Sequence, residues 1–568
     1  MTKYRKRATN KKQKRIVMKT KKIFSFVIFG LFLSQILVAE TRYVSMTGTG
    51  EPPYTTWANA SPSIYAAVSI CSNDDVVLVA TGVYMLGQAV TPGNSAMNRV
   101  VITNDILLQS VEGPEKTIID GGGNVRCVFM TKGTIDGFKL TNGYANSGNG
   151  AYYYNHVGGG LWITNGCVVT NCIVTGCRAY HMGGGLFFYG GSVFDSMFFN
   201  NVATGSYYGA SGGGVGGGGN LYNCIISNNF STGSGGGYFS FGIINVEKSE
   251  IVNNFSGTGG GACYGGHIYD SYISGNMARD GGGAYYSIIS NCTILSNCAT
   301  NNGGGTYWCS LQDSKVLNNV ATNDGGGCCS DWHIEKCLLG NNSATRGGGM
   351  FGNCRITLSV ISNNTAESYG GGICFFKVDG SSDVMLTNCL ICSSNTAEYG
   401  GGLALLGGGK VFSCTIADNF AEKIGGGFFC DNGAYNSQIE FYDTIIYQNL
   451  ALEAGENWST NGMVSTVFNS CCTYPTNTLP QFHLCIPDNP LFVIPDNDYH
   501  LQVESPCIDA GEEMSWMTGA TDLDGNPRIQ GSSVDIGCYE LVPEPGCYLL
   551  FIIYQLLFVN RKFLFNLW

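Results

Sequence analysis

Residues 281–302 read GGGAYYSIISNCTILSNCATNN, and residues 303–324 repeat the phrase as GGGTYWCSLQDSKVLNNVATND. Each unit opens with three glycines, continues through short apolar runs and reaches an asparagine two residues before an alanine. Five consecutive spacings between such glycine triplets are 22, 22, 22, 22 and 23 residues, a period typical of a solenoid. The triplets begin at Gly158, Gly183, Gly212, Gly235, Gly259, Gly281, Gly303, Gly325, Gly347, Gly370, Gly400 and Gly425.

The chemistry of the repeat selects one kind of solenoid. Three glycines in every unit would cost a helix about 1 kcal/mol each, and the period fits neither a 34-residue helical pair nor a propeller blade. Leucine-rich repeats need several leucines per unit, which residues 281–302 lack. The sequence therefore predicts an all-β fold, a right-handed parallel β-helix with coils of about 22 residues, in which equivalent strands pair at about 4.8 Å.

Two polar columns follow from this stacking. A small residue, Ser or Cys, precedes the asparagine by five positions, as Cys292 precedes Asn297 and Ser314 precedes Asn319. Stacked asparagines can hydrogen-bond along the axis, while cysteine in the small column behaves as a buried hydrophobe with a free thiol. We expect an asparagine ladder made of Asn201, Asn229, Asn254, Asn276, Asn297, Asn319, Asn342, Asn364, Asn395, Asn419 and Asn449.

Charge is divided unevenly along the chain. Of the 30 Lys and Arg residues, 11 lie within residues 1–22, which leaves 19 basic against 41 acidic residues, a net charge of −22, in the remainder. Nucleic acids are bound through clustered Lys and Arg. The acidic body therefore excludes nucleic acid as a partner.

The amino-terminal segment has the order of a secretory signal. Lys19, Lys21 and Lys22 precede an uncharged, mostly apolar run over residues 23–38, and Ala39 and a polar chain follow it. We expect a protein that is secreted, extracellular or associated with the cell surface or outer membrane. Its partners would include export and sorting machinery, and it would meet the membrane only through this signal and the carboxy-terminal tail.

The period divides the chain into segments. Since solenoids need atypical units at their ends, we expect caps on both sides of the repeats. The expected segments are 1–39, basic extension and signal peptide; 40–157, amino-terminal cap and first irregular coils; 158–455, β-helix array; 456–541, carboxy-terminal cap; and 542–568, sorting tail. Longer spacings predict protruding insertions at residues 206–219, 378–383 and 432–437.

The repeat resembles that of a known family. Gly347-Gly-Gly-Met350 and Ile361-Ser-Asn-Asn364 are similar to the Gly-Gly-Ala-Ile and Phe-x-x-Asn motifs of polymorphic outer-membrane proteins. The resemblance covers roughly residues 158–455 by its period. It implies a secreted right-handed β-helix displayed at the cell surface, where it is often adhesive.

The carboxy-terminal region resembles two further kinds of segment. Asn489-Pro490-Leu491-Phe492 and Val534-Asp535-Ile536-Gly537-Cys538-Tyr539-Glu540 are similar to motifs of the choice-of-anchor Q domain, which would seal the last open coil. A PEP-type sorting signal, which an exosortase processes, is indicated by a short motif, an apolar run over residues 547–559 and a basic pair. The residues of that signal are Pro543, Glu544, Pro545, Arg561 and Lys562.

The sequence offers few candidate catalytic or metal-binding residues. Parallel β-helices also resemble pectate lyases and polygalacturonases, so a polysaccharide lyase or glycoside hydrolase acting on acidic glycans is the alternative to a non-enzymatic rod. No catalytic constellation stands out; the alternative catalytic residues are Asp331, His333 and Lys336, which surround Trp332 in one coil. No cofactor or metal is predicted, and the alternative is Ca²⁺ at Asp522, Asp524 and Asn526, which more readily form a turn.

Aromatic residues follow many triplets, among them Tyr285, Tyr286, Tyr307 and Trp308. Alternation along a strand turns some of these rings outward, where they could hold carbohydrate, although packing between coils is the simpler use. We therefore expect a surface rod that contacts carbohydrate or the surface of a host or neighbouring cell. Its function would be adhesive or structural.

Overall fold

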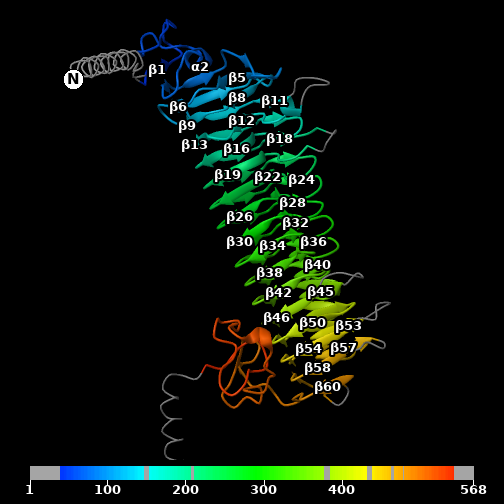
Figure 1. Ribbon diagram of the computed structural model, residues 1–568. Coiled ribbons are helices and arrows are strands. Elements are labelled where there is room, and N and C mark those ends of the chain that lie inside the picture. The colour runs from blue at the N-terminus through cyan, green and yellow to red at the C-terminus, as the bar shows by residue number, and fades with distance from the viewer. Residues whose placement is uncertain are drawn as a thin grey trace, which may run out of the picture.

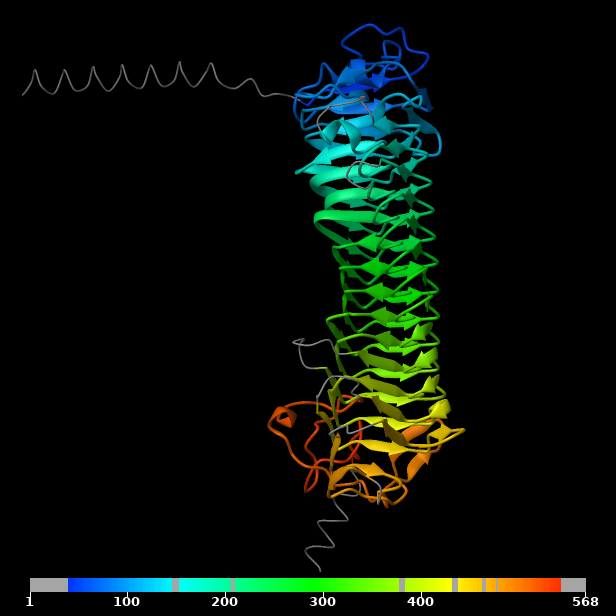
Figure 2. The ribbon, with the colours of Figure 1, turned by 90° about the vertical axis from the view of Figure 1, so that its right-hand side faces the viewer.

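In the computed structural model, the repeat forms a right-handed parallel β-helix whose coils stack into a long rod (Figures 1 and 2). The structure describes residues 39–145, 153–205, 210–376, 384–431, 438–461, 466–476 and 479–542. The signal peptide, the sorting residues Pro543, Glu544, Pro545, Arg561 and Lys562, and the insertions 378–383 and 432–437 lie outside the described residues, as do residues 206–209 of the first insertion.

One coil shows how the repeat makes this shape. Residues 281–302 contain β29 (Ala284–Tyr285), β30 (Ile288–Ser290), β31 (Thr293–Leu295) and β32 (Cys298–Ala299). Tyr286, Asn291 and Ser296 separate these strands with φ values of 55°, 52° and 54°. Such left-handed residues turn the chain sharply, so four short strands close one circuit.

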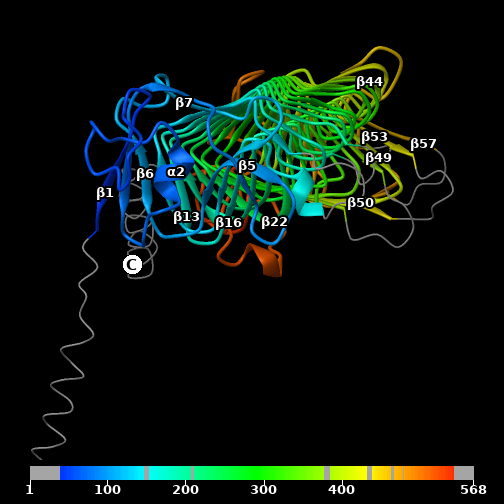
Figure 3. The same ribbon diagram turned by 90° about the horizontal axis from the view of Figure 1, so that it is seen from above.

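Equivalent strands of successive coils pair in parallel and build three long sheets. Within the described residues, β29 and β30 belong to a 31-stranded sheet, β31 to a 16-stranded sheet and β32 to a 13-stranded sheet. The view along the rod shows the coils superimposed on one another (Figure 3). Ala284, Ile289 and Ile294 are fully buried and face the interior, where they join a hydrophobic core that runs from Val44 to Leu479.

The glycine triplet has a specific geometric reason. Gly281 takes φ of 63°, and a Cβ on Gly282 would collide with the backbone of Cys298 and Gly304. The preceding coil is shifted by one residue from the alignment by sequence. There Gly260, with φ of 69°, holds the position that is equivalent to Gly281. Gly259 instead pairs with Asp280, so this coil is one residue shorter than the spacing from Gly259 suggests.

Coils begin before the expected array and continue after it. β1 (Thr41–Val44) already pairs in parallel with β2 (Val76–Val79), and the short helix α2 (Ile64–Val68) packs beside them with Ser63 capping its first turn. At the other end, β57 (Trp458–Asn461), β58 (Thr466–Asn469) and β60 (Gln481–His483) still stack in register. The rod thus extends into the first part of the segment expected to cap it, residues 456–486.

The remaining segment, residues 490–541, does not seal the last coil. It lies beside the lower coils in Figures 1 and 2, and we call it the side module. It contains the antiparallel pair β61 (Phe492–Ile494) and β62 (Asp498–Leu501) and the 3-10 turn η2 (Ser515–Met517).

The side module packs on outward residues of the 16-stranded sheet. Leu390 and Cys392 of β47 (Leu390–Cys392) and Ile445 of β55 (Ile445–Tyr447) are buried beneath Tyr499 and Ile536. Apolar side chains on the outside of these coils explain why the module docks there, since burying them removes apolar surface from water. The expectation of an end cap is therefore wrong for these residues.

Among the residues that the structure describes, no helix combines the length and the apolar character that crossing a membrane requires.

Candidate functional site

The predicted asparagines lie in one buried column. Asn297 donates from its backbone N and its Nδ2 to Oδ1 of Asn319 at 2.9 and 3.0 Å, and its Nδ2 also donates to the carbonyl of Ile273 at 3.0 Å. The column continues past Asn449 to Asn457, whose Oδ1 accepts from Asn449 Nδ2 at 3.1 Å. Since these amides are engaged with one another, the column supports the fold and does not offer a ligand site.

The small column is equally enclosed. The backbone N of Cys292 donates to Ser314 Oγ at 3.1 Å, and the Cys292 thiol donates to the carbonyl of Ser290 at 3.2 Å. Burial raises the pKa of Cys292 to about 11. Every cysteine in the described part of the chain is a free thiol, and those buried in this column are protonated and unreactive at neutral pH.

The alternative catalytic residues are separated by the wall of the rod. Asp331 is fully buried, and its carboxylate accepts from the backbone N of Cys309 at 2.7 Å and from the hydroxyl of Thr306 at 2.5 Å. His333 and Lys336 lie on the outside, where His333 pairs with Glu335 at 3.3 Å. Asp331 is thus an interior residue, and the structure does not bring the three residues together.

Asp522, Asp524 and Asn526 form a turn. One oxygen of Asp522 accepts from the backbone N of Asp524 at 3.0 Å and of Asn526 at 2.7 Å, and the other accepts from the backbone N of Glu540 at 2.9 Å. The Asp522 carboxylate is therefore occupied by amides. Within the described residues, no three His, Cys, Asp or Glu side chains gather closely enough to hold a metal ion.

A cleft of about 710 Å³ separates the side module from the rod. Lys315, Lys336 and Leu338 line it on the rod, while Asp524 and Tyr539 line it on the module. The docking of the module thereby brings Lys336 near Asp524, two residues that the sequence placed in unrelated groups.

Next to the module wall of this cleft lies a histidine, His500, which is held between two carboxylates. His500 contacts Asp498 at 2.5 Å and Asp524 at 2.7 Å, and its ring stacks on Tyr539 at 4.0 Å. Burial lowers the pKa of His500, but the hydrogen bonds that its ring donates to the two carboxylates outweigh this effect and raise the pKa overall. The module wall carries Asp522 and Asp524, whereas the rod wall of the cleft carries Lys315 and Lys336 together with Asp313.

Aromatic side chains form a continuous patch outside the 31-stranded sheet, and we call it the aromatic surface. Tyr264, Tyr285 and Tyr307 hold equivalent positions on β25 (Cys263–Tyr264), β29 and β33 (Thr306–Tyr307). In two of these coils the following residue, at the turn, is also aromatic: Tyr286 follows Tyr285, and Trp308 follows Tyr307. The aromatic surface consists of Tyr264, Tyr285, Tyr286, Tyr307, Trp308 and Trp332.

The rings of this surface differ in how they face solvent. Tyr264 and Tyr285 stack at 5.0 Å with an angle of 10°, so each covers a face of the other. Tyr286 lies at 63° to Tyr285 and at 65° to Trp308, and Trp332 is 60% exposed. Because Asp331 points into the core, its neighbour Trp332 projects outward beside Tyr286, at 6.3 Å.

Polar groups border the aromatic surface on the side of the glycine triplets. Asp280 accepts from Asn301 Nδ2 at 2.7 Å and pairs with Arg279 at 2.9 Å. Burial, together with the nearby charge of Asp280, raises the pKa of Tyr307 to about 12. The phenol of Tyr307 is therefore neutral and can donate a hydrogen bond.

The sequence identified most of these rings by their place after the triplets, but it missed Tyr264. Its coil reads Gly259-Gly-Gly-Ala-Cys-Tyr264, and only the shift to Gly260 aligns Tyr264 with Tyr285. Other rings that follow glycine triplets, such as Phe187, Phe188 and Phe428, are buried. The sequence pattern does not distinguish exposed from buried rings, because aromatic residues follow the triplets at positions on both faces of the strand.

No family model matches the chain, and no curated protein does. Among solved structures, the pectate lyase Pel9A is 13% identical, with a TM-score of 0.20 and coverage of 89% of this chain and 98% of that one. XylC in complex with xylose is 12% identical, with a TM-score of 0.26 and coverage of 88% and 98%. A mannuronic acid specific polysaccharide family 6 lyase from human gut microbiota is 9% identical, with a TM-score of 0.24 and coverage of 60% and 82%. At these values the likenesses decide nothing about activity.

Proposed function

We propose that this chain is an exported, non-enzymatic rod at the cell surface that contacts glycans through its aromatic surface. The aromatic surface is the observation that carries the proposal. Apolar patches with a polar border often mark interaction sites on a protein surface, and here the exposed ring of Trp332 continues into five half-buried rings on a rigid sheet. The proposed location at the cell surface is supported by two sequence features. Residues 1–39 have the order of a secretory signal, and the carboxy-terminal tail resembles a PEP-type sorting signal.

A glycan suits this surface better than an apolar partner would. The rings of Tyr286, Trp308 and Trp332, which lie at angles to one another, offer apolar faces together with hydroxyl or N–H groups at their edges. Sugar units likewise combine apolar ring faces with hydroxyls. Rungs about 4.8 Å apart repeat at a distance comparable to one sugar unit, so a chain lying along the axis would meet one ring per coil.

The alternative function, cleavage of an acidic glycan, is favoured by one observation. Lys315 and Lys336 line the cleft beside Asp524, and neither lysine forms an ion pair within the described residues. Cationic side chains could hold the carboxylates of a polyuronate. Asp331, however, lies inside the rod and cannot reach substrate, so the binding function has the stronger support.

Affinity electrophoresis of the purified protein in gels containing soluble glucan, mannan or xylan tests the proposal. We expect at least one glycan to retard the wild type, and Trp332→Ala and Tyr286→Gly each to weaken binding about fivefold, because one stacked ring contributes roughly 1 kcal/mol. Glycine preserves the left-handed turn at position 286, since Gly265 holds the equivalent place with φ of 74°.

Phe482→Ala provides the matched control, because Phe482 is 57% exposed on β60, far along the rod from the aromatic surface. Its retardation should equal that of the wild type. Equal retardation of all variants, or none by any glycan, would contradict the proposal. If incubation with polyuronate released new reducing or unsaturated ends and Lys336→Asn abolished them, the enzymatic alternative would replace it.

A further inference from the structure

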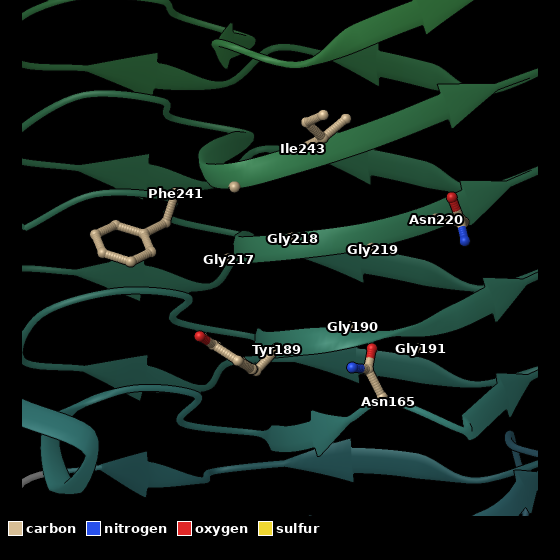
Figure 4. A pocket seen from close by; sticks show the side chains of 11 residues that line it. Asn165, Tyr189, Gly190, Gly191, Gly217, Gly218, Gly219, Asn220, Phe241 and Ile243 are labelled. Atoms are coloured by element: carbon tan, nitrogen blue, oxygen red, sulfur yellow. The ribbon is translucent and has the colours of Figure 1, made fainter.

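A hollow interrupts the outer face of the 31-stranded sheet on three coils. In these coils one long strand replaces the two short strands found elsewhere, as β16 (Leu186–Phe194), β19 (Val215–Tyr222) and β22 (Tyr238–Glu247). The hollow has a volume of about 470 Å³, within the range of small-ligand sites. Figure 4 shows it from outside.

A register shift creates the hollow. Gly217 pairs with Ser240 and Gly219 pairs with Ile244, so residues 241–243 lie opposite Gly218 alone. These extra residues lift away from the sheet, which leaves Phe241 67% exposed and Ile243 61% exposed. Bulges of this kind redirect side chains and often accompany functional sites.

The floor consists of backbone. A Cβ on Gly217 or Gly219 would collide with Phe188 beneath it, so these positions accept only glycine. At Gly218 a Cβ would have no atom closer than 3.3 Å, the carbonyl of Ile243 in the lifted segment. The missing side chains at consecutive positions are what open the space.

The walls combine rings and amides. Tyr189, 58% exposed, and Phe241 project at one end, on either side of the strand that carries Gly218, while Asn220 lies at the other end (Figure 4). Asn245 Nδ2 donates to Oδ1 of Asn220 at 2.9 Å and fixes that amide. Asn165 makes no side-chain hydrogen bond to the described residues, so its amide is available to a ligand.

The chemistry of the lining limits the ligand. Asn, Tyr, Gly, Phe and Ile are the residue types present, and none of them carries a formal charge. Exposed rings can cover the apolar face of a sugar ring, while amides both donate to and accept from hydroxyls. A charged ligand would find no partner in this hollow.

The hollow lies directly next to the aromatic surface along the rod. Phe239, two residues before Phe241 on β22, pairs with Tyr264 and stacks on its ring at 5.0 Å. We propose that the hollow binds a single hexose unit of a neutral glycan, the end of a chain whose following units lie along the aromatic surface. This inference rests on the proposed function and adds to it a direction and a terminal subsite.

Chain length separates the two sites in an experiment. Neutral disaccharides (cellobiose, maltose and mannobiose) and the corresponding hexasaccharides would be titrated into the wild type and followed by saturation-transfer NMR. We expect at least one disaccharide to bind, and Tyr189→Ala combined with Phe241→Ala to weaken its binding at least tenfold. Trp332→Ala should leave the disaccharide unaffected and weaken only the hexasaccharide.

Phe194→Ala is the matched control, because Phe194 lies on β16 beyond the hollow and is 37% exposed. Both altered side chains of the double variant are exposed, so its melting temperature should equal that of the control. If hexasaccharides bound and no disaccharide did, or if the double variant bound disaccharides as the wild type does, the hollow would not be the subsite while the proposed function stood. Binding of no glycan at all would overturn both.

Discussion

Asp331 is buried inside the rod, although an isolated aspartate is expected at the protein surface. Its carboxyl group takes the position that the thiol of Cys309 holds in the preceding coil. The Cys309 sulfur accepts a hydrogen bond from the backbone N of Ser287 at 3.4 Å, as the Asp331 carboxylate does from the backbone N of Cys309. Burial raises the pKa of Asp331 to about 7, although hydrogen bonds from Thr306 and Cys309 oppose the change. The folded protein therefore holds a proton there that the unfolded chain releases near pH 4.

This proton predicts a pH-dependent stability. Between about pH 4 and pH 7 the folded state binds more protons at Asp331 than the unfolded state does, so stability falls as pH rises and stays low above pH 7. Asp331→Asn should raise the free energy of unfolding at pH 8 by on the order of 2–4 kcal/mol and change it little at pH 4.

Guanidinium unfolding followed by circular dichroism at both pH values measures the difference. Asp313→Asn is the control, since Asp313 is exposed at a left-handed turn with φ of 49° that asparagine also accepts. A variant at position 331 that is destabilised equally at both pH values would show that the carboxylate is ionised in the fold.

Single residues also mark the limit of inference from sequence. A repeat alignment predicts that Asn319 lines the interior because each coil from that of Asn201 to that of Asn449 has an asparagine there. It gives no such signal for Asp331, which stands where neighbouring coils have Ser287 and Cys309. An isolated aspartate reads as exposed because an ionised carboxylate is costly to bury, and only the register of the coil places it inside.

At the scale of elements, the asparagine column joins coils that otherwise share only short strands. Asn319 Oδ1 accepts two hydrogen bonds from Asn297, and its Nδ2 donates to Ile294 O at 3.0 Å and to Asn342 Oδ1 at 3.1 Å. Strands of two or three residues such as β31 and β32 provide little pairing alone. The column holds each turn in place between them.

Asn319→Ala should therefore be strongly destabilising. It leaves the backbone N of Asn297 buried without an acceptor and removes one of the two acceptors of the Asn297 Nδ2, a loss on the order of 3 kcal/mol. Asn323→Ala, in the same coil, removes only an exposed hydrogen bond to Asn301 and should change stability by less than about 0.5 kcal/mol. Equal unfolding midpoints for the two variants in guanidinium would mean that the column does not support the fold.

The elements that the sequence did not predict are those set by contacts distant in the chain. The docking of the side module depends on outward apolar residues such as Leu390 and Ile445, which read in the sequence as ordinary strand positions. The lifted segment of β22 depends on how β22 pairs with Gly218 of the preceding coil. The period of the repeat carries no information about this register shift. Period and triplets predict the coils, but not what interrupts or covers them.

At the scale of the whole molecule, the protein is a rod that carries the side module on one flank and its candidate binding sites on another. The side module covers the outside of the 16-stranded sheet near one end, whereas no described residue covers the aromatic surface or the hollow on the 31-stranded sheet. A glycan bound there would run parallel to the rod axis. Stacked coils provide the rigid spacing that such a linear site needs.

Hydroxyl-radical footprinting of aromatic side chains, with and without the glycan that binds most tightly, tests this arrangement most directly. We predict that oxidation of Tyr286, Trp308 and Trp332 falls several-fold in the complex while that of Phe482 and Tyr474 does not change, because only the former lie under the chain. Protection confined to the side module and the cleft, or none on the aromatic surface while the glycan stays bound, would contradict the account.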